Sequence, residues 1–344
     1  MRNREKLNEI APSSFRRKKS SAFEKPMENF EIILVSVLLD LARLLRFPLG
    51  VMASISGLAA GFIVIRLQDS SLGIIDIITI YWVQILIGLP IPALIVCGAM
   101  AINDAMDYES DKANNRLDRP LVRGVFSPLF ALSLALIMLA IGGLLSIVLV
   151  NLGLHYVNYW VVVFTFGFIA IAVSYSTWLK KYGFWGNVSV SLSYPAAILL
   201  GGFVVGFQRA DVLIAVASFG TLIFFTALGR ELLKGVMDLE GDKLVGVMTI
   251  AARYGPKTAA IGSLLCFLTS ASIAPIPAYF AFRDHSLSLL LYAAFVILMI
   301  GLNIYAGLAL VREPSHEVST KGRKRTKLAL WSGTLGYFLS AIAL

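Results

Sequence analysis

Two clusters of acidic residues at the ends of long apolar runs are the part of this sequence whose residue types and spacing could do chemistry. The first reads N-D-A-M-D-Y-E-S-D and contains Asn103, Asp104, Asp107 and Asp111. The second reads D-L-E-G-D and contains Asp238 and Asp242. The chain has only 21 Asp and Glu in 344 residues, so this concentration of carboxylates indicates a site for a divalent cation.

Helical spacing within each cluster would place its carboxylates on one face of a helix. The aspartates of the first cluster are spaced at i, i+3 and i+7, with Asn103 four residues before the middle one, and those of the second at i and i+4. Packed against each other, the two faces would offer oxygen ligands, and Mg²⁺ usually combines one or two carboxylates with waters and substrate phosphates. We therefore predict a Mg²⁺ site for a diphosphate substrate, with metal ligands Asp104, Asp107, Asp111, Asp238 and Asp242.

Basic residues surround both clusters and could bind phosphate oxygens or stabilise a departing diphosphate. A basic bias of cytoplasmic loops would also place them there without any chemistry. The residues that we expect to act in catalysis are Asn103, Asp107, Arg119, Lys234 and Asp238. The predicted substrate-binding residues are Arg46, Arg116, Arg123, Tyr175, Lys180, Lys181, Asn187 and Arg230.

The composition places these residues in a membrane protein. Hydrophobic residues make up 58% of the chain, charged residues 15%, and the mean hydropathy is +0.78. Apolar runs of about 18 residues or more recur, each long enough to cross a membrane as a helix. A membrane β-barrel would show short alternating segments instead. The net charge of +9 bears on orientation and anionic lipid, and no nucleic-acid or protein partner is implied.

The apolar runs predict an all-α polytopic bundle of nine transmembrane helices. The predicted spans are approximately 47–65, 77–102, 128–150, 156–176, 186–207, 212–229, 257–281, 287–311 and 327–344. Before them, residues 1–30 are predicted to be a basic disordered cytoplasmic tail, and residues 31–46 suit an amphipathic helix at the membrane interface. Residues 31–344 are then one transmembrane domain.

The distribution of basic residues predicts the orientation. With the N-terminus in the cytoplasm, all but three of the 30 Lys and Arg fall in the tail and the loops after even-numbered spans. The exceptions are Arg66, Arg209 and Arg283. By the positive-inside rule, the C-terminus is outside and both acidic clusters face the cytoplasm of a cell membrane. Because four spans separate the clusters, they also predict a parallel repeat of four helices plus one extra helix.

At this point the two motifs resemble those of the UbiA superfamily of intramembrane prenyltransferases. The first family motif, N-D-x-x-D-x-x-x-D, is similar to residues 103–111, and its continuation R-P-L-x-S-G is similar to residues 119–124. The second is similar to residues 230–249, R-E-L-L-K-G-V-M-D-L-E-G-D-K-L-V-G-V-M-T. The resemblance covers about residues 40–344. It implies a nine-helix bundle with a central cavity open to lipid, and Mg²⁺-dependent transfer of a polyprenyl group from its diphosphate.

Within the family, D-Y-E-S-D-K and D-L-E-G-D-K most resemble the archaeal branch that makes digeranylgeranylglyceryl phosphate. This implies transfer of a geranylgeranyl group to the hydroxyl of geranylgeranylglyceryl phosphate, a step of ether-lipid synthesis. The chain departs from the family at Gly235, where an Asp usually follows the Lys of R-E-x-x-K-D, and Glu231 could substitute. It also reads R-F-P-L-G from Arg46, where relatives often have R-P-x-N.

Three other functions remain open from the sequence. An aromatic acceptor, as in quinone or chlorin synthesis, would use the same donor site, although Arg46, Lys180 and Lys181 favour a phosphorylated acceptor. A cyclase-like member would have no separate acceptor. A cation-coupled transporter would place ionisable residues near the bilayer midplane, whereas these span interiors are nearly free of charge.

Overall fold

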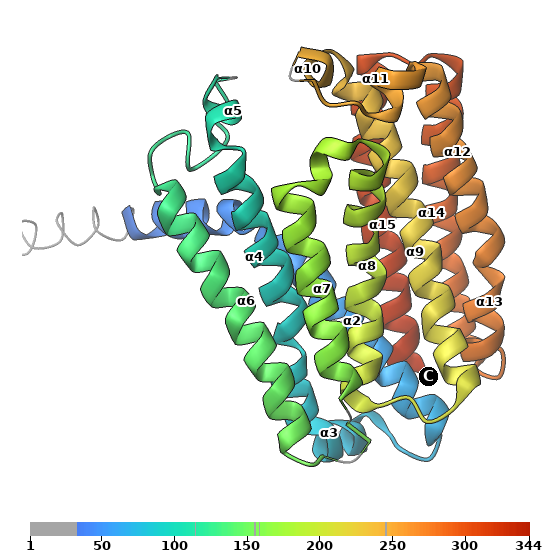
Figure 1. Ribbon diagram of the computed structural model, residues 1–344. Coiled ribbons are helices and arrows are strands. Elements are labelled where there is room, and N and C mark those ends of the chain that lie inside the picture. Colours follow the sequence, from blue (N-terminus) through green and yellow to red (C-terminus); the bar gives the residue numbers. More distant parts are fainter. Residues whose placement is uncertain (1–32, 114, 155, 158, 245) are drawn as a thin grey trace, which may run out of the picture.

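The computed structural model describes residues 33–344 apart from residues 114, 155, 158 and 245, and the regular elements of that part are all helical (Figure 1). The predicted tail, residues 1–30, lies outside the described residues. An all-α fold follows from the apolar composition, because a helix satisfies its backbone hydrogen bonds within one segment of chain in lipid.

The helices follow one another with short connections. Residues 33–44 are helical and lead into a turn before α2. The labelled elements are α2 (Phe47–Gln68), α3 (Ile74–Gly88), α4 (Pro90–Met106), α5 (Tyr108–Ala113), α6 (Pro128–Asn151), α7 (Trp160–Thr177), η1 (Leu179–Tyr182), α8 (Phe184–Val205), α9 (Ala210–Met237), α10 (Leu239–Leu244), α11 (Ile250–Tyr254), α12 (Pro256–Ile273), α13 (Pro275–Pro277), η2 (Ala278–Phe282), α14 (Ser286–Arg312) and α15 (His316–Ala343).

Eight helical segments of the described chain are long and apolar enough to cross a membrane, so the protein is an integral multi-pass membrane protein. The first eight predicted spans correspond to these segments. The predicted count of nine is not confirmed, because residues 327–344 lie in α15, whose polar and basic first turns lower its hydropathy. α15 still packs along α14, α2 and α9 as part of the bundle (Figure 1).

A proline-rich break divides the second span into α3 and α4. Pro90 and Pro92 lie at the start of α4, where they cannot donate the backbone hydrogen bonds that would continue α3. The break gives α4 its own direction, and it runs from α3 to α5 at the other end of the bundle (Figure 1). The first acidic motif lies at that end.

Glycines let α2 and α8 meet at backbone contact. A Cβ atom on Gly201 of α8 would lie only 1.9 Å from the Gly57 carbonyl oxygen of α2. No side chain fits at this distance, so the crossing requires glycine there. The crossing holds together two of the helices that enclose the central cavity.

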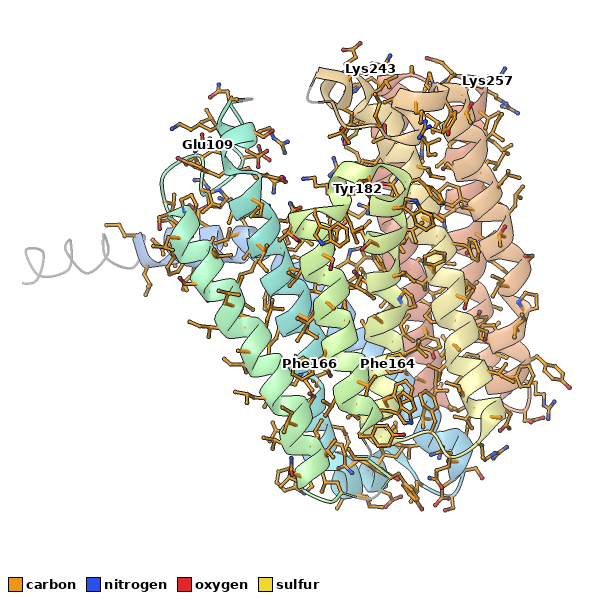
Figure 2. All side chains as sticks on the ribbon, in the orientation of Figure 1. Glu109, Phe164, Phe166, Tyr182, Lys243 and Lys257 are labelled. Carbon is orange, nitrogen blue, oxygen red and sulfur yellow. The ribbon has the colours of Figure 1, made fainter. Side chains whose placement is uncertain are left out.

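Both acidic motifs lie at the same end of the bundle. α5 and α10 are at this end, with helix 33–44 crossing beside α4, and the C-terminus lies at the opposite end (Figure 1). The charged side chains of Glu109, Lys243 and Lys257 extend from this end, whereas Phe164 and Phe166 lie lower on α7 (Figure 2). The fold therefore separates a charged end from an apolar interior.

Candidate active site

The first acidic motif continues the hydrogen bonding of α4 into α5. Asp107 ends α4, and its N–H donates to the Asn103 carbonyl at 3.0 Å. The Asp111 N–H in turn donates to the Asp107 carbonyl at 2.8 Å. These i, i+4 bonds keep Asn103, Asp107 and Asp111 on one side of the chain, so the motif has the helical geometry that its spacing predicts.

The second motif repeats this backbone structure 131 residues later (238 − 107). The Asp238 N–H donates to the Lys234 carbonyl and the Asp242 N–H to the Asp238 carbonyl, both at 2.9 Å. Each short helix then ends at a left-handed residue, Asn115 with φ 52° and Gly246 with φ 74°. The N–H that follows donates to the carbonyl of the motif's last aspartate, at 3.0 Å in the first motif and 2.9 Å in the second. The two motifs are thus copies in structure.

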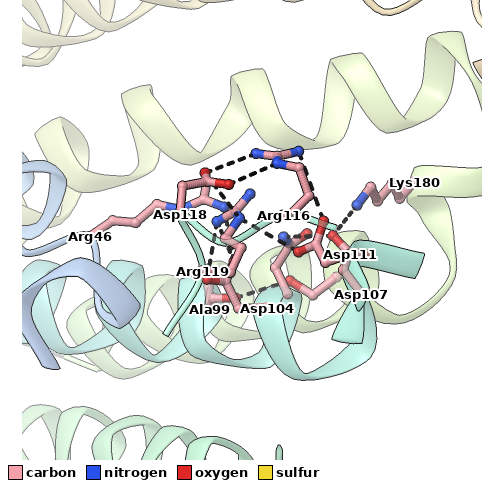
Figure 3. A network of polar contacts seen from close by, with 11 residues as sticks. Arg46, Ala99, Asp104, Asp107, Asp111, Arg116, Asp118, Arg119 and Lys180 are labelled. Carbon is pink, nitrogen blue, oxygen red and sulfur yellow. Dashed lines mark hydrogen bonds and ion pairs between the residues drawn. The ribbon is translucent and has the colours of Figure 1, made fainter. Parts of the chain in front are cut away.

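Asp104 is a buried carboxylate that holds two arginines (Figure 3). Its residue is 2% exposed, and its Oδ1 accepts from Arg46 Nη2 at 3.0 Å and from Arg119 Nη1 at 2.9 Å. A buried charge requires such partners. This predicted metal ligand therefore occupies an arginine-binding position in the structure.

Asp107 and Asp111 lie further along the motif than Asp104 and have additional partners (Figure 3). Asp107 Oδ2 accepts from Asn103 Nδ2 at 3.0 Å and forms an ion pair with Lys180 of η1. Asp111 Oδ2 lies 3.5 Å from Arg119 Nε. The loop after α7 thus reaches the first motif through Lys180, and the substrate-binding role of Lys180 stays a prediction.

The second motif has a different distribution of ion pairs. Glu231 lies between Arg230, at 3.4 Å, and Lys234, at 3.6 Å, and its side chain is only 11% exposed. Among the described residues, neither Asp238 nor Asp242 makes an ion pair within 4.0 Å, although both are half-buried. A cation would therefore not have to displace a basic side chain of the described residues from these two carboxylates.

Burial and neighbouring negative charges raise the pKa of one carboxylate in each motif. Desolvation raises the pKa of Asp111 above its ordinary value, and desolvation together with the Asp238 charge raises the pKa of Asp242 to about 6. The pKa of Arg116 is also raised, chiefly by its hydrogen bond to Asp118, with Asp238 a smaller contributor. The charge of Asp238 in the second motif thus contributes to the pKa of Arg116, which follows the first motif.

The donor set can be tested against the predicted Mg²⁺. Desolvated carboxylates near like charges are groups that a bound cation stabilises, and an all-oxygen set suits Mg²⁺ better than a soft metal. In the described part of the chain, no three His, Cys, Asp or Glu side chains are gathered as a metal centre. The residue types fit Mg²⁺, while basic side chains hold the first motif's carboxylates.

An apolar cavity lies inside the bundle, next to the first motif. It encloses about 740 Å³ of space, its open side included, between α2, α4, α7, α8, α9 and α15. Its lining includes Met52, Met100, Phe168, Tyr175, Tyr194 and Ile198. Met100 is one turn of α4 before Asp104, so the cavity begins next to the first motif. The predicted central cavity is confirmed, and Tyr175 lies in its wall.

Three predicted binding residues make no described side-chain hydrogen bond or ion pair with the acidic motifs. Arg123 Nη2 donates to Asp40 Oδ1 at 2.6 Å, away from the acidic motifs. Asn187 has no side-chain hydrogen bond among the described residues, and the side chain of Lys181 is not described. Sequence reasoning missed Asp40, although a single acidic residue in an apolar helix is a signal for a buried ion pair.

The protein is a polytopic helical bundle with two aspartate motifs and an apolar cavity. These features suit a ligand that has a charged head group and a long apolar chain. The model of the UbiA prenyltransferase family matches residues 37–337. The chain belongs to this family, and the resemblance of its motifs is confirmed.

Curated relatives share much of the chain's length. It is 33% identical to a digeranylgeranylglyceryl phosphate synthase of Archaeoglobus fulgidus over 258 residues, which cover 75% of this chain and 84% of that protein. It is 30% identical to the synthase of the same name from Sulfolobus acidocaldarius over 238 residues, covering 69% and 78%.

Solved structures show the same fold. A structure of a digeranylgeranylglyceryl phosphate synthase matches with a TM-score of 0.64 at 23% identity, covering 90% of this chain and all of that one. A UbiA homologue from Archaeoglobus fulgidus bound to GPP and Mg²⁺ matches with a TM-score of 0.54 at 18% identity, covering 89% and 100%. At these identities the likeness is one of fold.

Proposed function

We propose that this protein transfers a geranylgeranyl group from its diphosphate to the hydroxyl of geranylgeranylglyceryl phosphate, in ether-lipid synthesis. The observation that carries the proposal is the pair of structurally duplicated aspartate motifs beside an apolar cavity. A diphosphate suits the charged end and a long isoprenoid chain suits the cavity. The names of the curated relatives at 33% and 30% identity support this donor and acceptor.

The surroundings of the aspartates favour a division of roles. Asp107 and Asp111 of the first motif and Asp238 and Asp242 of the second would hold Mg²⁺, because they are half-buried carboxylates at matching positions. Asp104 instead would hold arginines in place. Mg²⁺ bound there would neutralise charge on the diphosphate as it leaves.

The chain's own residues supply the rest of the mechanism. Lys180, Lys234 and Arg116 would donate hydrogen bonds to phosphate oxygens and stabilise the negative charge that develops on the leaving group. Asn103 would hold Asp107 in position through the bond that it already makes. The apolar cavity would hold the isoprenoid chain and keep water from the reactive allylic carbon while the acceptor hydroxyl attacks.

We further infer that the motifs face the cytoplasm, with the C-terminus outside, from the basic bias of the loops. Residues 1–30 would form a separate basic tail, since the family match begins at residue 37. A chain that starts at residue 31 should then keep its turnover, and loss of turnover would contradict this division.

An acceptor assay tests the function. The full-length protein in nanodiscs would receive geranylgeranyl diphosphate and Mg²⁺, with geranylgeranylglyceryl phosphate or 4-hydroxybenzoate as acceptor and EDTA as the control. We expect EDTA-sensitive transfer to the glycerol phosphate. Transfer to the aromatic acid alone would contradict the acceptor assignment, and transfer to neither would contradict the proposal.

A further inference from the structure

Helix 33–44 carries a buried acidic residue on its inner side. Asp40 is 6% exposed, whereas apolar side chains along the same helix, such as Ile33, Val35 and Leu38, are each more than half exposed. Such a helix suits the membrane surface, with its apolar side chains in the lipid. Asp40 is then turned toward the protein.

Asp40 connects this helix to the arginine-rich loop after α5. Its Oδ1 accepts from Arg123 Nη2 at 2.6 Å and from Arg43 Nη1 at 2.8 Å. Arg43 belongs to the same helix, but Arg123 lies 83 residues further along the chain. The bond to Arg123 is therefore a direct contact between the helix and the loop.

The loop is short and well bonded between Arg119 and Arg123. The Arg123 N–H donates to the Arg119 carbonyl at 3.1 Å, and the Val125 N–H donates to the Pro120 carbonyl at 3.0 Å. Leu121, in the same turn, is 2% exposed. Because one turn of chain joins Arg119 to Arg123, the position of one side chain depends on the anchoring of the other.

A second link joins the same helix to the same turn. Arg46, in the turn between helix 33–44 and α2, has the left-handed conformation with φ 45°, which is costly for a residue with a side chain. Its guanidinium group bonds Asp104, which also binds Arg119. Two links therefore connect helix 33–44 and the residues after it to the turn that carries Arg119: the direct ion pair of Asp40 with Arg123, and the ion pairs of Arg46 and Arg119 with Asp104.

We propose that Asp40 is a positioning residue, which anchors the 115–125 loop through Arg123 so that Arg116 and Arg119 meet the diphosphate of the donor. The proposal rests on the proposed function for the identity of the diphosphate. Asp40 does not touch the substrate. It acts through Arg123, which joins the loop to the helix at the membrane surface.

Donor binding measures this role without any acceptor. The full-length protein in nanodiscs would be titrated with geranylgeranyl thiolodiphosphate and Mg²⁺, in wild type and in Asp40→Asn, Asp40→Glu and Arg123→Gln. We expect Asp40→Asn and Arg123→Gln to weaken binding about tenfold each, a typical loss when a supporting partner is removed. The double variant should be no weaker than either single one, because both remove the same contact. Asp40→Glu keeps the charge and should restore most of the affinity.

A matched control separates this role from charge loss in general. Asp211→Asn removes another aspartate that is paired with an arginine: Asp211 lies in the first turn of α9, and its partner Arg209 directly precedes that helix. This variant should leave donor affinity unchanged. Equal donor affinity in wild type and Asp40→Asn would overturn the inference while the proposed function stands. Failure of the wild type to bind the donor analogue would overturn the proposed function and this inference with it.

Discussion

At the scale of residues, Asp104 and Asp107 are three positions apart in one motif but have different surroundings. Asp104 is buried beneath two guanidinium groups. Asp107, whose side chain is 26% exposed, pairs with the Lys180 ammonium group and accepts a hydrogen bond from the Asn103 amide. A metal ion would need to displace only Lys180 from Asp107, whereas at Asp104 it would have to displace two arginines from a buried site.

This difference predicts separate effects on Mg²⁺ dependence. Asp107→Asn and Asp238→Asn should lower kcat about a hundredfold or more, since each removes a carboxylate ligand of the Mg²⁺ that would neutralise the departing diphosphate. Asp104→Asn should lower turnover but leave the Mg²⁺ concentration for half-maximal rate unchanged. Titrating initial rates with Mg²⁺ in nanodiscs measures both quantities. A several-fold shift of the Mg²⁺ dependence in Asp104→Asn would contradict the division of roles.

The repeat of the two motifs also bears on Gly235, where relatives usually have an Asp. Subtracting the 131-residue offset places Gly235 at the position of Asp104 (235 − 131 = 104). The atoms nearest to a Cβ at Gly235 belong to Thr249 and Ala251, at 3.8–4.0 Å, and not to arginines. Position 235 corresponds to Asp104, which binds two arginines. A side chain at position 235 would instead contact Thr249 and Ala251.

We therefore expect Gly235→Asp to leave the Mg²⁺ dependence of turnover as it is, because the equivalent position in the first half holds arginines. The same titration of initial rates tests this. If Gly235→Asp instead lowered the Mg²⁺ requirement several-fold, residue 235 would be a metal-ligand position and the equivalence with Asp104 would be wrong.

At the scale of elements, the crossing of α2 and α8 limits which side chains the bundle accepts. Gly201→Ala would place a methyl group 1.9 Å from the Gly57 carbonyl, and overpacking of this kind costs about 1–3 kcal/mol. We expect a lower Tm and lower turnover, measured by thermal unfolding in detergent. Gly167→Ala on α7 is the matched control, because a Cβ there meets no atom within 4 Å. An unchanged Tm in Gly201→Ala would contradict the close approach.

The elements show what sequence could and could not predict. Apolar runs predicted nine spans, and eight of them correspond to membrane-crossing segments of the described chain, because hydropathy is a local property of each helix. The spacing of the aspartates predicted the geometry of each motif for the same reason. The bonds from Arg46 to Asp104 and from Arg123 to Asp40 join segments 58 and 83 residues apart, and no local pattern specifies such partners. Both arginines were therefore predicted as substrate-binding residues, whereas here they hold aspartates.

At the scale of the whole molecule, the charged end of the bundle should face the cytoplasm. Glu109 in α5 and Asp284 after η2 are both exposed, and the positive-inside rule places them on opposite sides. With Cys97 and Cys266 replaced, Glu109→Cys should react with an impermeant maleimide only after cells are opened. Asp284→Cys should react on intact cells. The reverse labelling pattern would contradict the orientation.

The measurement that tests the central claim most directly is an experimental structure of the full-length protein with Mg²⁺ and geranylgeranyl thiolodiphosphate. We expect metal density between Asp107 and Asp111 of the first motif and Asp238 and Asp242 of the second. Lys180 should have left Asp107 for the diphosphate, and the isoprenoid chain should lie in the cavity between α2, α4, α7 and α8. Metal bound at Asp104, or a chain outside this cavity, would contradict the account.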